Sequence, residues 1–209
     1  MSLWFEIRSW AFPSLYLHKS FEELAILTQK GDENAFLTIY ERLKNPIYNY
    51  TYNLVSQDKE IAQDITQETF LKALKNIEQY KKDFKFSTWI WTIARNTAFD
   101  HMRKVGLSDN YVDDEKLKTA FENTSVCSLT SLEKQFHLKE IKMYIEECLN
   151  KLPQQFKESL IMQLFAQMSY HEMTLALAIN ENTLKSNLLR AKKAMATCLE
   201  HKEIGASNE

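Results

Sequence analysis

The 209-residue sequence contains only three glycines and three prolines. Hairpins and other tight turns of β-sheet proteins depend on these residues, so their scarcity disfavours a turn-rich β architecture. No apolar run approaches the roughly 20 residues that a membrane-spanning helix needs, and we expect no membrane insertion. The formal net charge of −2 excludes a protein that is basic over its whole surface, although local basic patches stay open.

Cysteine is scarce as well. Cys127, Cys148 and Cys198 are odd in number, far apart and without a C-x-x-C motif. This pattern argues against a disulfide framework and a structural zinc site, and it suits a reducing cytoplasm. No catalytic triad or glycine-rich phosphate loop occurs, and His171-Glu172 lacks the second histidine of a zinc protease motif. We therefore expect a cytoplasmic protein that is not an enzyme, with no catalytic residues, no metal site and no cofactor.

Helical periodicity is what the sequence does contain. Apolar residues recur every three or four positions from Phe36 to Leu54, which predicts a long helix with a kink or local irregularity at Pro46. Capping and termination patterns predict neighbouring helices that begin at Ser20, near Asp58 and at a Ser87 cap. The last of these runs to about residue 104.

The periodicity fades between residues 105 and 128, where five acidic residues stand against two lysines, a net charge of −3. Such a composition is typical of a tether. Helical spacing resumes afterwards, so the predicted fold is all-α: two small helical bundles joined by a flexible acidic linker. The expected divisions are an N-terminal extension (1–20), a first bundle (21–104), the linker (105–128), a second bundle (129–203) and a tail (204–209).

Residues 169–195 predict a helix-turn-helix. A Ser169/Glu172 capping box begins a short helix, and Asn180 caps the second helix after a tight turn. The second helix has an apolar inward stripe and a basic opposite face, and residues 181–202 carry a net charge of +3 from five cations and two acids. Such a face suits DNA phosphates and guanine edges. An ordinary amphipathic helix with a solvated lysine face explains the periodicity equally well.

The stretch FKFSTWIWTIARNTAFDHMRK begins at Phe84 and contains five large aromatic and four cationic side chains. From residue 81 to residue 104, six cations and two acids give a net charge of +4. Either the helix carries much of a core, or it presents a nucleic-acid surface. Phe86 and Trp89 are expected in the core beneath a polar and basic face, while base contacts by Tyr80 and Phe84 stay open.

Both halves resemble bacterial RNA polymerase sigma factors of the extracytoplasmic-function subgroup. LPQQFKESLIMQLFAQMSYHEMTLALAINENTLKSNLLRAKK resembles their region 4. GDENAFLTIYERLKNPIYNYTYNLVSQDKEIAQDITQETFLKALKNIEQY and FSTWIWTIARNTAFDHMRK resemble their region 2, in the family's order. The resemblance covers Phe21 to His201. It implies a dissociable subunit that directs core RNA polymerase to specific promoters, promotes DNA melting there, and answers to stress or envelope signals.

The resemblance also implies partners and roles. The partners are core RNA polymerase, through the clamp helices of its largest subunit and its flap, promoter DNA and an anti-sigma factor. The residues implied to bind polymerase, all expected to be exposed, are Asp64, Gln67, Glu68 and Leu71. Those implied for the downstream (minus-ten) element are Tyr80, Lys81, Lys82, Phe84, Lys85, Arg95, Asn96, Asp100 and Arg103. Those implied for the upstream (minus-thirty-five) element are Asn182, Thr183, Lys185, Ser186, Leu189, Arg190 and Lys193.

Two residues depart from the family pattern: Ala178 stands where glycine is usual in the turn, and Asn187 stands where a basic residue is usual. The first predicts strain, and the second predicts a lost phosphate contact. Two other functions stay open. One is a helix-turn-helix regulator that never joins polymerase. The other is an adaptor that binds polymerase or an anti-sigma factor without reading DNA.

Overall fold

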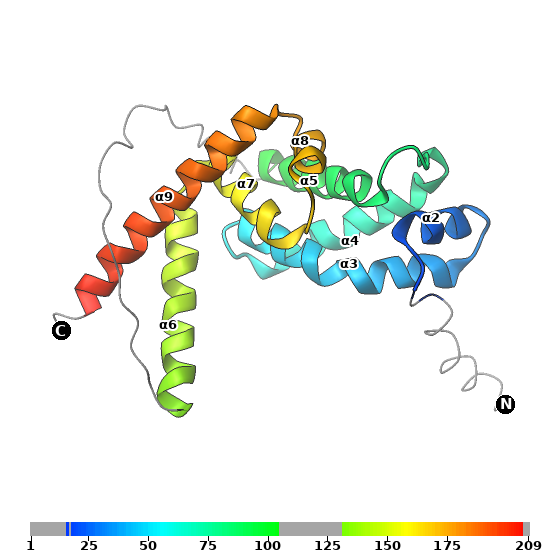
Figure 1. The fold of residues 1–209 in the computed structure, drawn as a ribbon. Helices are drawn as coiled ribbons and strands as arrows, with labels where there is room; N and C mark the ends of the chain where they lie inside the picture. The colour runs from blue at the N-terminus through cyan, green and yellow to red at the C-terminus, as the bar shows by residue number, and fades with distance from the viewer. Residues whose placement is uncertain (1–15, 17, 105–130, 207–209) are drawn as a thin grey trace.

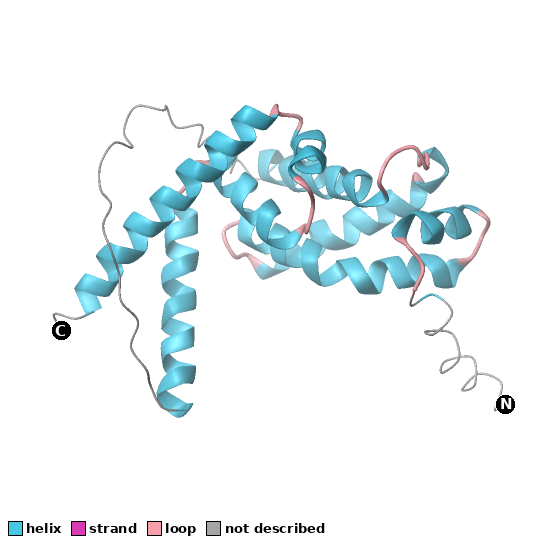
Figure 2. Cartoon of the chain, viewed as in Figure 1, coloured by secondary structure: helices cyan, strands magenta, loops and turns pink. Residues whose placement is uncertain are grey.

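The computed structural model describes residue 16, residues 18–104 and residues 131–206. All regular structure in these ranges is helical, with no strand (Figures 1 and 2). The all-α prediction is therefore confirmed. The predicted linker (105–128) and most of the N-terminal extension lie outside the described residues.

The first half contains α2 (Phe21–Gln29), α3 (Glu33–Leu54), α4 (Lys59–Lys75), the short 3₁₀ helix η1 (Ile77–Gln79) and α5 (Phe86–Lys104). The Ser20/Glu23 capping box begins α2 as predicted. Helix α3 runs through Pro46 without a break. The predicted Ser87 cap is wrong, because α5 begins one residue earlier, at Phe86. The backbone N–H of Phe86 donates to Glu22 Oε1 at 3.0 Å, so the end of α5 is satisfied from α2.

The second half contains α6 (Ser131–Asn150), α7 (Gln154–Phe165), α8 (Tyr170–Leu177) and α9 (Glu181–Ala206). The Ser169/Glu172 capping box begins α8, and Asn180 Oδ1 accepts the Thr183 N–H at 2.8 Å at the start of α9. Helices α8 and α9 thus form the predicted helix-turn-helix. Helix α6 and the C-terminal part of α9 extend away from the rest of the molecule (Figure 1).

A disulfide joins Cys148 of α6 to Cys198 of α9, with the two Cα atoms 5.8 Å apart. The prediction that the cysteines form no disulfide is therefore wrong for this pair. The two residues lie 50 positions apart in the sequence. Only the packing of α6 on α9 brings them together, and spacing along the chain does not reveal such a long-range contact.

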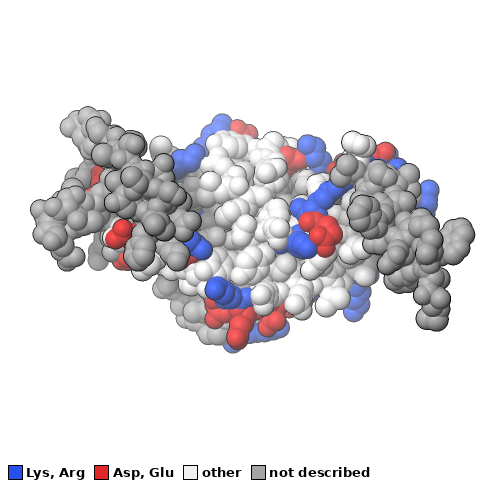
Figure 3. Space-filling view, turned by 90° about the horizontal axis from the view of Figure 1, so that it is seen from below, with Lys and Arg blue, Asp and Glu red and all other residues white. Residues whose placement is uncertain are grey.

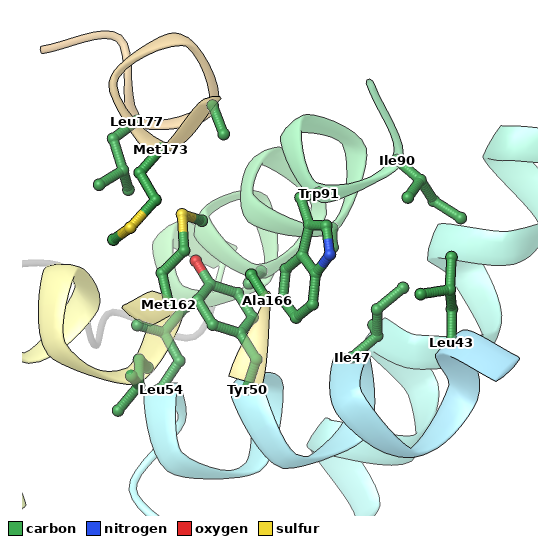
Figure 4. Close-up of a cluster of buried hydrophobic side chains, with 14 of the residues drawn as sticks. Leu43, Ile47, Tyr50, Leu54, Ile90, Trp91, Met162, Ala166, Met173 and Leu177 are labelled. Carbon is green, nitrogen blue, oxygen red and sulfur yellow. The ribbon is translucent and has the colours of Figure 1, made fainter. Parts of the chain in front are cut away.

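The two halves share one continuous core, as Figure 4 shows. Tyr50 of α3 meets Trp91 of α5 edge to face, with ring centroids 5.3 Å apart. Met162 of α7 and Ala166, which follows the end of α7, lie against this pair, and Met173 of α8 lies close by. Burying each large apolar side chain stabilises the fold by about 1.5–3 kcal/mol. The two predicted bundles are therefore present and pack directly on each other.

Ala178 ends α8 in the left-handed conformation, with φ 55° and ψ 40°. The predicted strain is confirmed, because a Cβ is disfavoured at positive φ. We expect Ala178→Gly to raise the free energy of unfolding by about 1 kcal/mol, measured by urea denaturation. As a control, Ala176→Gly, in the interior of the same helix, should lower it. An equal loss of unfolding free energy from both substitutions would contradict strain at Ala178.

Lys157 of α7 is only 3% exposed, and its Nζ donates to the neutral amide oxygen of Asn150 at 2.9 Å. Burial lowers the pKa of Lys157 from its ordinary value near 10.5 to about 8. Between these two pH values the unfolded chain binds more protons than the folded chain. The free energy of unfolding therefore rises with pH across this window, by up to about 3 kcal/mol.

We accordingly expect Lys157→Met to stabilise the chain at neutral pH by up to about 3 kcal/mol and to flatten this pH dependence. The control is Lys151→Met, at an exposed lysine that pairs with Glu147. Urea denaturation at a series of pH values measures both. A wild-type stability that stays flat above pH 8, together with no gain from Lys157→Met, would contradict the buried charge.

Candidate nucleic-acid interface

Helix α9 separates its two faces as the sequence predicted. Leu184, Leu188 and Ala191 are buried, and they share the core with Met173 and Leu177 of α8. The residues predicted to read the upstream element all lie on the accessible side of α9, exposed or partly exposed: Asn182, Thr183, Lys185, Ser186, Leu189, Arg190 and Lys193. The helix-turn-helix therefore presents one continuous polar and basic face.

Two basic side chains and one apolar side chain stand out on this α9 face. Lys185 Nζ lies 2.6 Å from Glu181, which raises the pKa of Lys185. Such an exposed pair is weak, so a phosphate can replace the carboxylate. The guanidinium carbon of Arg190 lies 5.9 Å from the centroid of the Phe156 ring, which positions the arginine. Leu189 is 71% exposed, an apolar group among polar ones.

Asn187 does not belong to this face. Its side chain is 7% exposed, and its Nδ2 donates to Ser159 Oγ of α7 at 3.4 Å. The expectation that Asn187 costs the surface a phosphate contact is therefore wrong, because this position packs against α7.

The loop between η1 and α5 holds exposed lysines at 81, 82 and 85 and one exposed ring, Phe84, which is 63% exposed. Tyr80 is only 4% exposed. Its ring packs on Phe86 and Trp89, with centroids 5.2 and 5.6 Å away, and its hydroxyl donates to the Phe84 carbonyl at 2.7 Å. Tyr80 is therefore a core residue in this structure, so only Phe84 of the two rings is open to a base.

Three predicted residues of α5 lie together near its C-terminal end. Asn96 is exposed, and Asp100 pairs with Arg103 one turn away. These three residues line a cavity of about 520 Å³. Gln154 of α7 completes its wall, so the second half already borders this part of α5.

Two other predicted phosphate-binding cations are paired with carboxylates of the second half. Arg95 Nε lies 2.6 Å from Glu158 Oε1 of α7, and the Tyr50 hydroxyl donates to the same oxygen at 3.4 Å. Lys85 Nζ lies 2.9 Å from Glu172 Oε1 of α8. Arg95 is therefore largely withdrawn from solvent in this arrangement, whereas the Lys85 side chain is 67% exposed and could still reach a phosphate.

The two glutamates have different surroundings. Burial raises the pKa of Glu158, although Arg95 opposes the shift. Burial would also raise the pKa of Glu172, but hydrogen bonds from Ser169 and Lys85 lower it to about 2. The Glu172 carboxylate is therefore ionised at neutral pH, and it binds both the N-cap residue of α8 and Lys85.

On the acidic face of α4, Glu68 differs from its predicted companions in binding a second helix. Asp64, Gln67 and Leu71 are exposed, as expected. Glu68 is partly buried, because it binds His101 Nε2 of α5 at 2.5 Å and Lys72 at 2.9 Å. Lys72 and then His101 lower the pKa of Glu68. Glu68 thus connects α4 to α5, while 35% of its side chain stays exposed on the same face.

The face of the molecule in Figure 3 is mostly uncharged across its middle. Around this middle, the basic and acidic side chains of the described residues lie in small mixed clusters. Among the described residues, this view shows no broad field of one sign, in keeping with the pairing of cations by nearby carboxylates.

Comparisons with known proteins agree with this layout. Residues 39–107 match the family model of sigma-70 region 2, and residues 142–195 match that of sigma-70, region 4. The ECF RNA polymerase sigma factor SigW of Bacillus subtilis is 30% identical over 170 residues, which cover 80% of this chain and 90% of SigW. The RNA polymerase sigma-H factor of Pseudomonas aeruginosa is 26% identical over 181 residues, covering 86% and 93%.

Two solved structures share the fold. CnrH in complex with the cytosolic domain of CnrY aligns with a TM-score of 0.64 and 16% identity, covering 88% of this chain and 99% of CnrH. RpoE from Bartonella quintana, in complex with the anti-sigma factor NepR, aligns with a TM-score of 0.59 and 21% identity, covering 79% and 96%.

Among the described residues, no helix is long and apolar enough to cross a membrane. The same residues hold no group of three or more side chains that could bind a metal ion. Both regions occur in one chain in family order, and a relative is 30% identical over nine-tenths of its length. The chain therefore belongs to the ECF RNA polymerase sigma factors, which are non-catalytic factors for promoter-specific transcription initiation.

Proposed function

We propose that this sigma factor reads the upstream promoter element with the basic face of α9. The observation that supports this most strongly is that the α9 residues implied by sequence share one accessible face over a buried helix-turn-helix core. Lys185 and Arg190 would contact phosphates and guanine edges, while Leu189 would make apolar contacts in the major groove. The second half (129–203) would then act as sigma region 4.

The first half (21–104) would act as sigma region 2 and promote melting at the downstream element. A base that leaves the duplex stack costs a few kcal/mol, and stacking on an aromatic ring returns about 1–3 kcal/mol. Phe84 is the exposed ring of the loop, and Lys81 and Lys82 stand beside it for phosphates. Asn96 and Asp100 would read the flipped base.

For polymerase, the α4 residues Asp64, Gln67, Glu68 and Leu71 form the proposed docking face for the clamp helices of the largest subunit. Glu68 is 35% exposed, and it also binds His101 and Lys72. The second half would contact the polymerase flap.

An anti-sigma factor is the third proposed partner. CnrH was solved with the cytosolic domain of CnrY, and RpoE was solved with the anti-sigma factor NepR. We extend binding by an anti-sigma factor to the present chain. It would then be a cytoplasmic protein that a stress or envelope signal releases from its anti-sigma factor.

Run-off transcription with core RNA polymerase, with and without this protein, on promoter fragments of the source genome tests the proposal. Specific transcripts that require the protein are expected, and their start sites would give the consensus. Binding to core without transcripts would favour the adaptor instead. Binding to duplex DNA without binding to core would favour a self-sufficient regulator.

For the upstream element, we expect Arg190→Ala to weaken binding of the holoenzyme to its promoter by about 1–3 kcal/mol. The loss should be specific to the position that Arg190 reads. Fluorescence anisotropy with a duplex promoter fragment measures it. Lys192→Ala, at an exposed lysine of α9 outside the proposed contact set, is the control. Equal losses of affinity from both substitutions would mean that Arg190 only attracts phosphates and makes no base-specific contact.

For polymerase docking, we expect Asp64→Lys to lower the affinity for core RNA polymerase by at least about tenfold. The proposed partner helix is basic, so it would attract the carboxylate of Asp64 and repel a lysine at this position. The melting temperature should stay unchanged, since Asp64 is exposed. Glu41→Lys, at an exposed site on α3, is the control. A titration of labelled core polymerase that gives wild-type affinity for Asp64→Lys would remove α4 from the docking surface.

A further inference from the structure

Helix α2 holds both ends of the loop between η1 and α5, which carries the ring that we assign to a base. Its last residue, Gln29, donates from Nε2 to the carbonyl oxygens of Ile77 at 2.8 Å and Tyr80 at 2.9 Å, where the loop begins. Near the start of α2, Glu22 Oε1 accepts the backbone N–H of Phe86 at 3.0 Å, where α5 begins. The two side chains therefore bind the backbone at the two ends of this loop.

Aromatic rings pack at the same two ends. The Phe21 ring of α2 stacks on Phe86, with centroids 6.3 Å apart, and the Tyr80 ring meets Phe86 edge to face at 5.2 Å. The Tyr80 hydroxyl donates to the Phe84 carbonyl at 2.7 Å. Burial, and then the Glu22 carboxylate, raise the pKa of Tyr80 to about 12, so this hydroxyl keeps its proton at neutral pH. The backbone of Phe84 is thus held while its ring stays exposed.

Helix α2 is itself fixed on the bundle. Leu24 and Ala25 are fully buried, and the helix packs on α3, η1 and α5. The capping box of Ser20 and Glu23 satisfies its first backbone N–H groups. A side chain on such a fixed helix gives a defined position to the loop that it binds. Helix α2 can therefore act as a support for the loop.

Helix α2 also lies outside the part of the chain that matches the family model of region 2. That match begins at residue 39, whereas α2 spans Phe21–Gln29. The residues that we assign to the downstream element all lie between Tyr80 and Arg103. The contacts of α2 thus reach this surface from a segment to which we assigned no part in promoter binding.

The position of the loop before DNA binds affects how well it can hold an unpaired strand. A loop that becomes ordered only during binding loses conformational entropy, and this loss weakens the binding. The loop carries Lys81, Lys82 and the exposed ring of Phe84. A flipped base and its phosphates meet these groups only when the backbone between them is correctly placed. Hydrogen bonds from Gln29 and to Glu22 restrict that backbone before DNA arrives.

We propose that Gln29 and Glu22 are positioning residues for promoter melting, because they hold the loop so that Phe84 and its neighbouring lysines can bind the unpaired strand. Both act through the loop backbone, without contacting DNA. This inference rests on the proposed role of the loop at the downstream element. Separate variants in the following experiment distinguish a failure of that role from a failure of the support by α2.

The test uses holoenzyme formed from core RNA polymerase and the full chain, on a promoter fragment that run-off transcription identifies. Gln29→Met keeps the length of the side chain and removes both N–H donors. The equilibrium constant for promoter melting, measured by permanganate reactivity of unpaired thymines, should fall at least about fivefold, because one hydrogen bond changes an equilibrium by up to about tenfold. The affinities for core polymerase and for the closed, duplex promoter should stay at wild-type values. A generally destabilised chain would lose both affinities together with melting.

Glu22 offers a matched pair of variants. Glu22→Met removes the acceptor of the Phe86 N–H and should impair melting as Gln29→Met does. Glu22→Gln keeps an acceptor oxygen at the same place and should keep most of the melting. Gln155→Met, at an exposed glutamine of α7, is the control for the loss of an amide and should melt the promoter as wild type does. An equal loss from Gln155→Met and Gln29→Met would overturn a specific role for Gln29.

Phe84→Ala distinguishes the loop from its support. A Phe84→Ala chain that melts the promoter as wild type does would overturn the role of the loop, and the inference with it. If Phe84→Ala impairs melting while Gln29→Met and Glu22→Met do not, the loop keeps its role and the support by α2 is overturned. If circular dichroism shows that Gln29→Met loses helix, Glu22→Met is compared with Glu22→Gln instead. Weaker melting by Glu22→Met would then support the inference, and equal melting by the two would overturn it.

Discussion

The apolar core that Tyr50 of α3 and Trp91 of α5 share with Met162 of α7 is the contact on which the arrangement of the two regions depends. The ion pair between Arg95 and Glu158 lies beside it, where the Tyr50 hydroxyl donates to the same Glu158 oxygen. Because Glu158 is buried and Arg95 is only 25% exposed, removal of one partner would leave a poorly solvated charge. A second ion pair between the two regions, Lys85 with Glu172, uses a carboxylate that already caps α8. The fold of the helix-turn-helix and its position on region 2 are thus connected through one side chain.

Much of the fold could be predicted from the sequence, because local rules decide it. The capping boxes at Ser20 and Ser169 and the cap at Asn180 begin helices where the side-chain pattern places them. The apolar stripe of α9 is buried for the same reason, since residues three or four apart share one helix face. The accessible α9 residues follow directly, because a helix that buries one face must expose the other. The strain at Ala178 was predictable as well, since a turn that usually holds glycine keeps its positive φ when alanine replaces it.

The remaining features depend on contacts between segments far apart in the sequence. Glu22 satisfies the start of α5, and His101 of α5 binds Glu68 of α4. Helix packing also buries Tyr80 and joins Cys148 to Cys198. Periodicity states which side of a helix is buried but not which helix covers it. Glu158 is the clearest case: it lies within an α7 segment whose residues from 156 to 162 are all buried, so no clean apolar stripe distinguishes its role.

The central claim is that region 2 and region 4, which pack on each other in this structure, act on two separate promoter elements in the holoenzyme. Single-molecule fluorescence transfer between dyes at Glu33 of α3 and Lys192 of α9 tests it most directly, because both residues are exposed and outside the proposed contacts. We expect high transfer for the free chain and low transfer once core polymerase and promoter are bound. The same transfer efficiency in both states would contradict the claim, since the two regions would then stay in contact while the promoter is read.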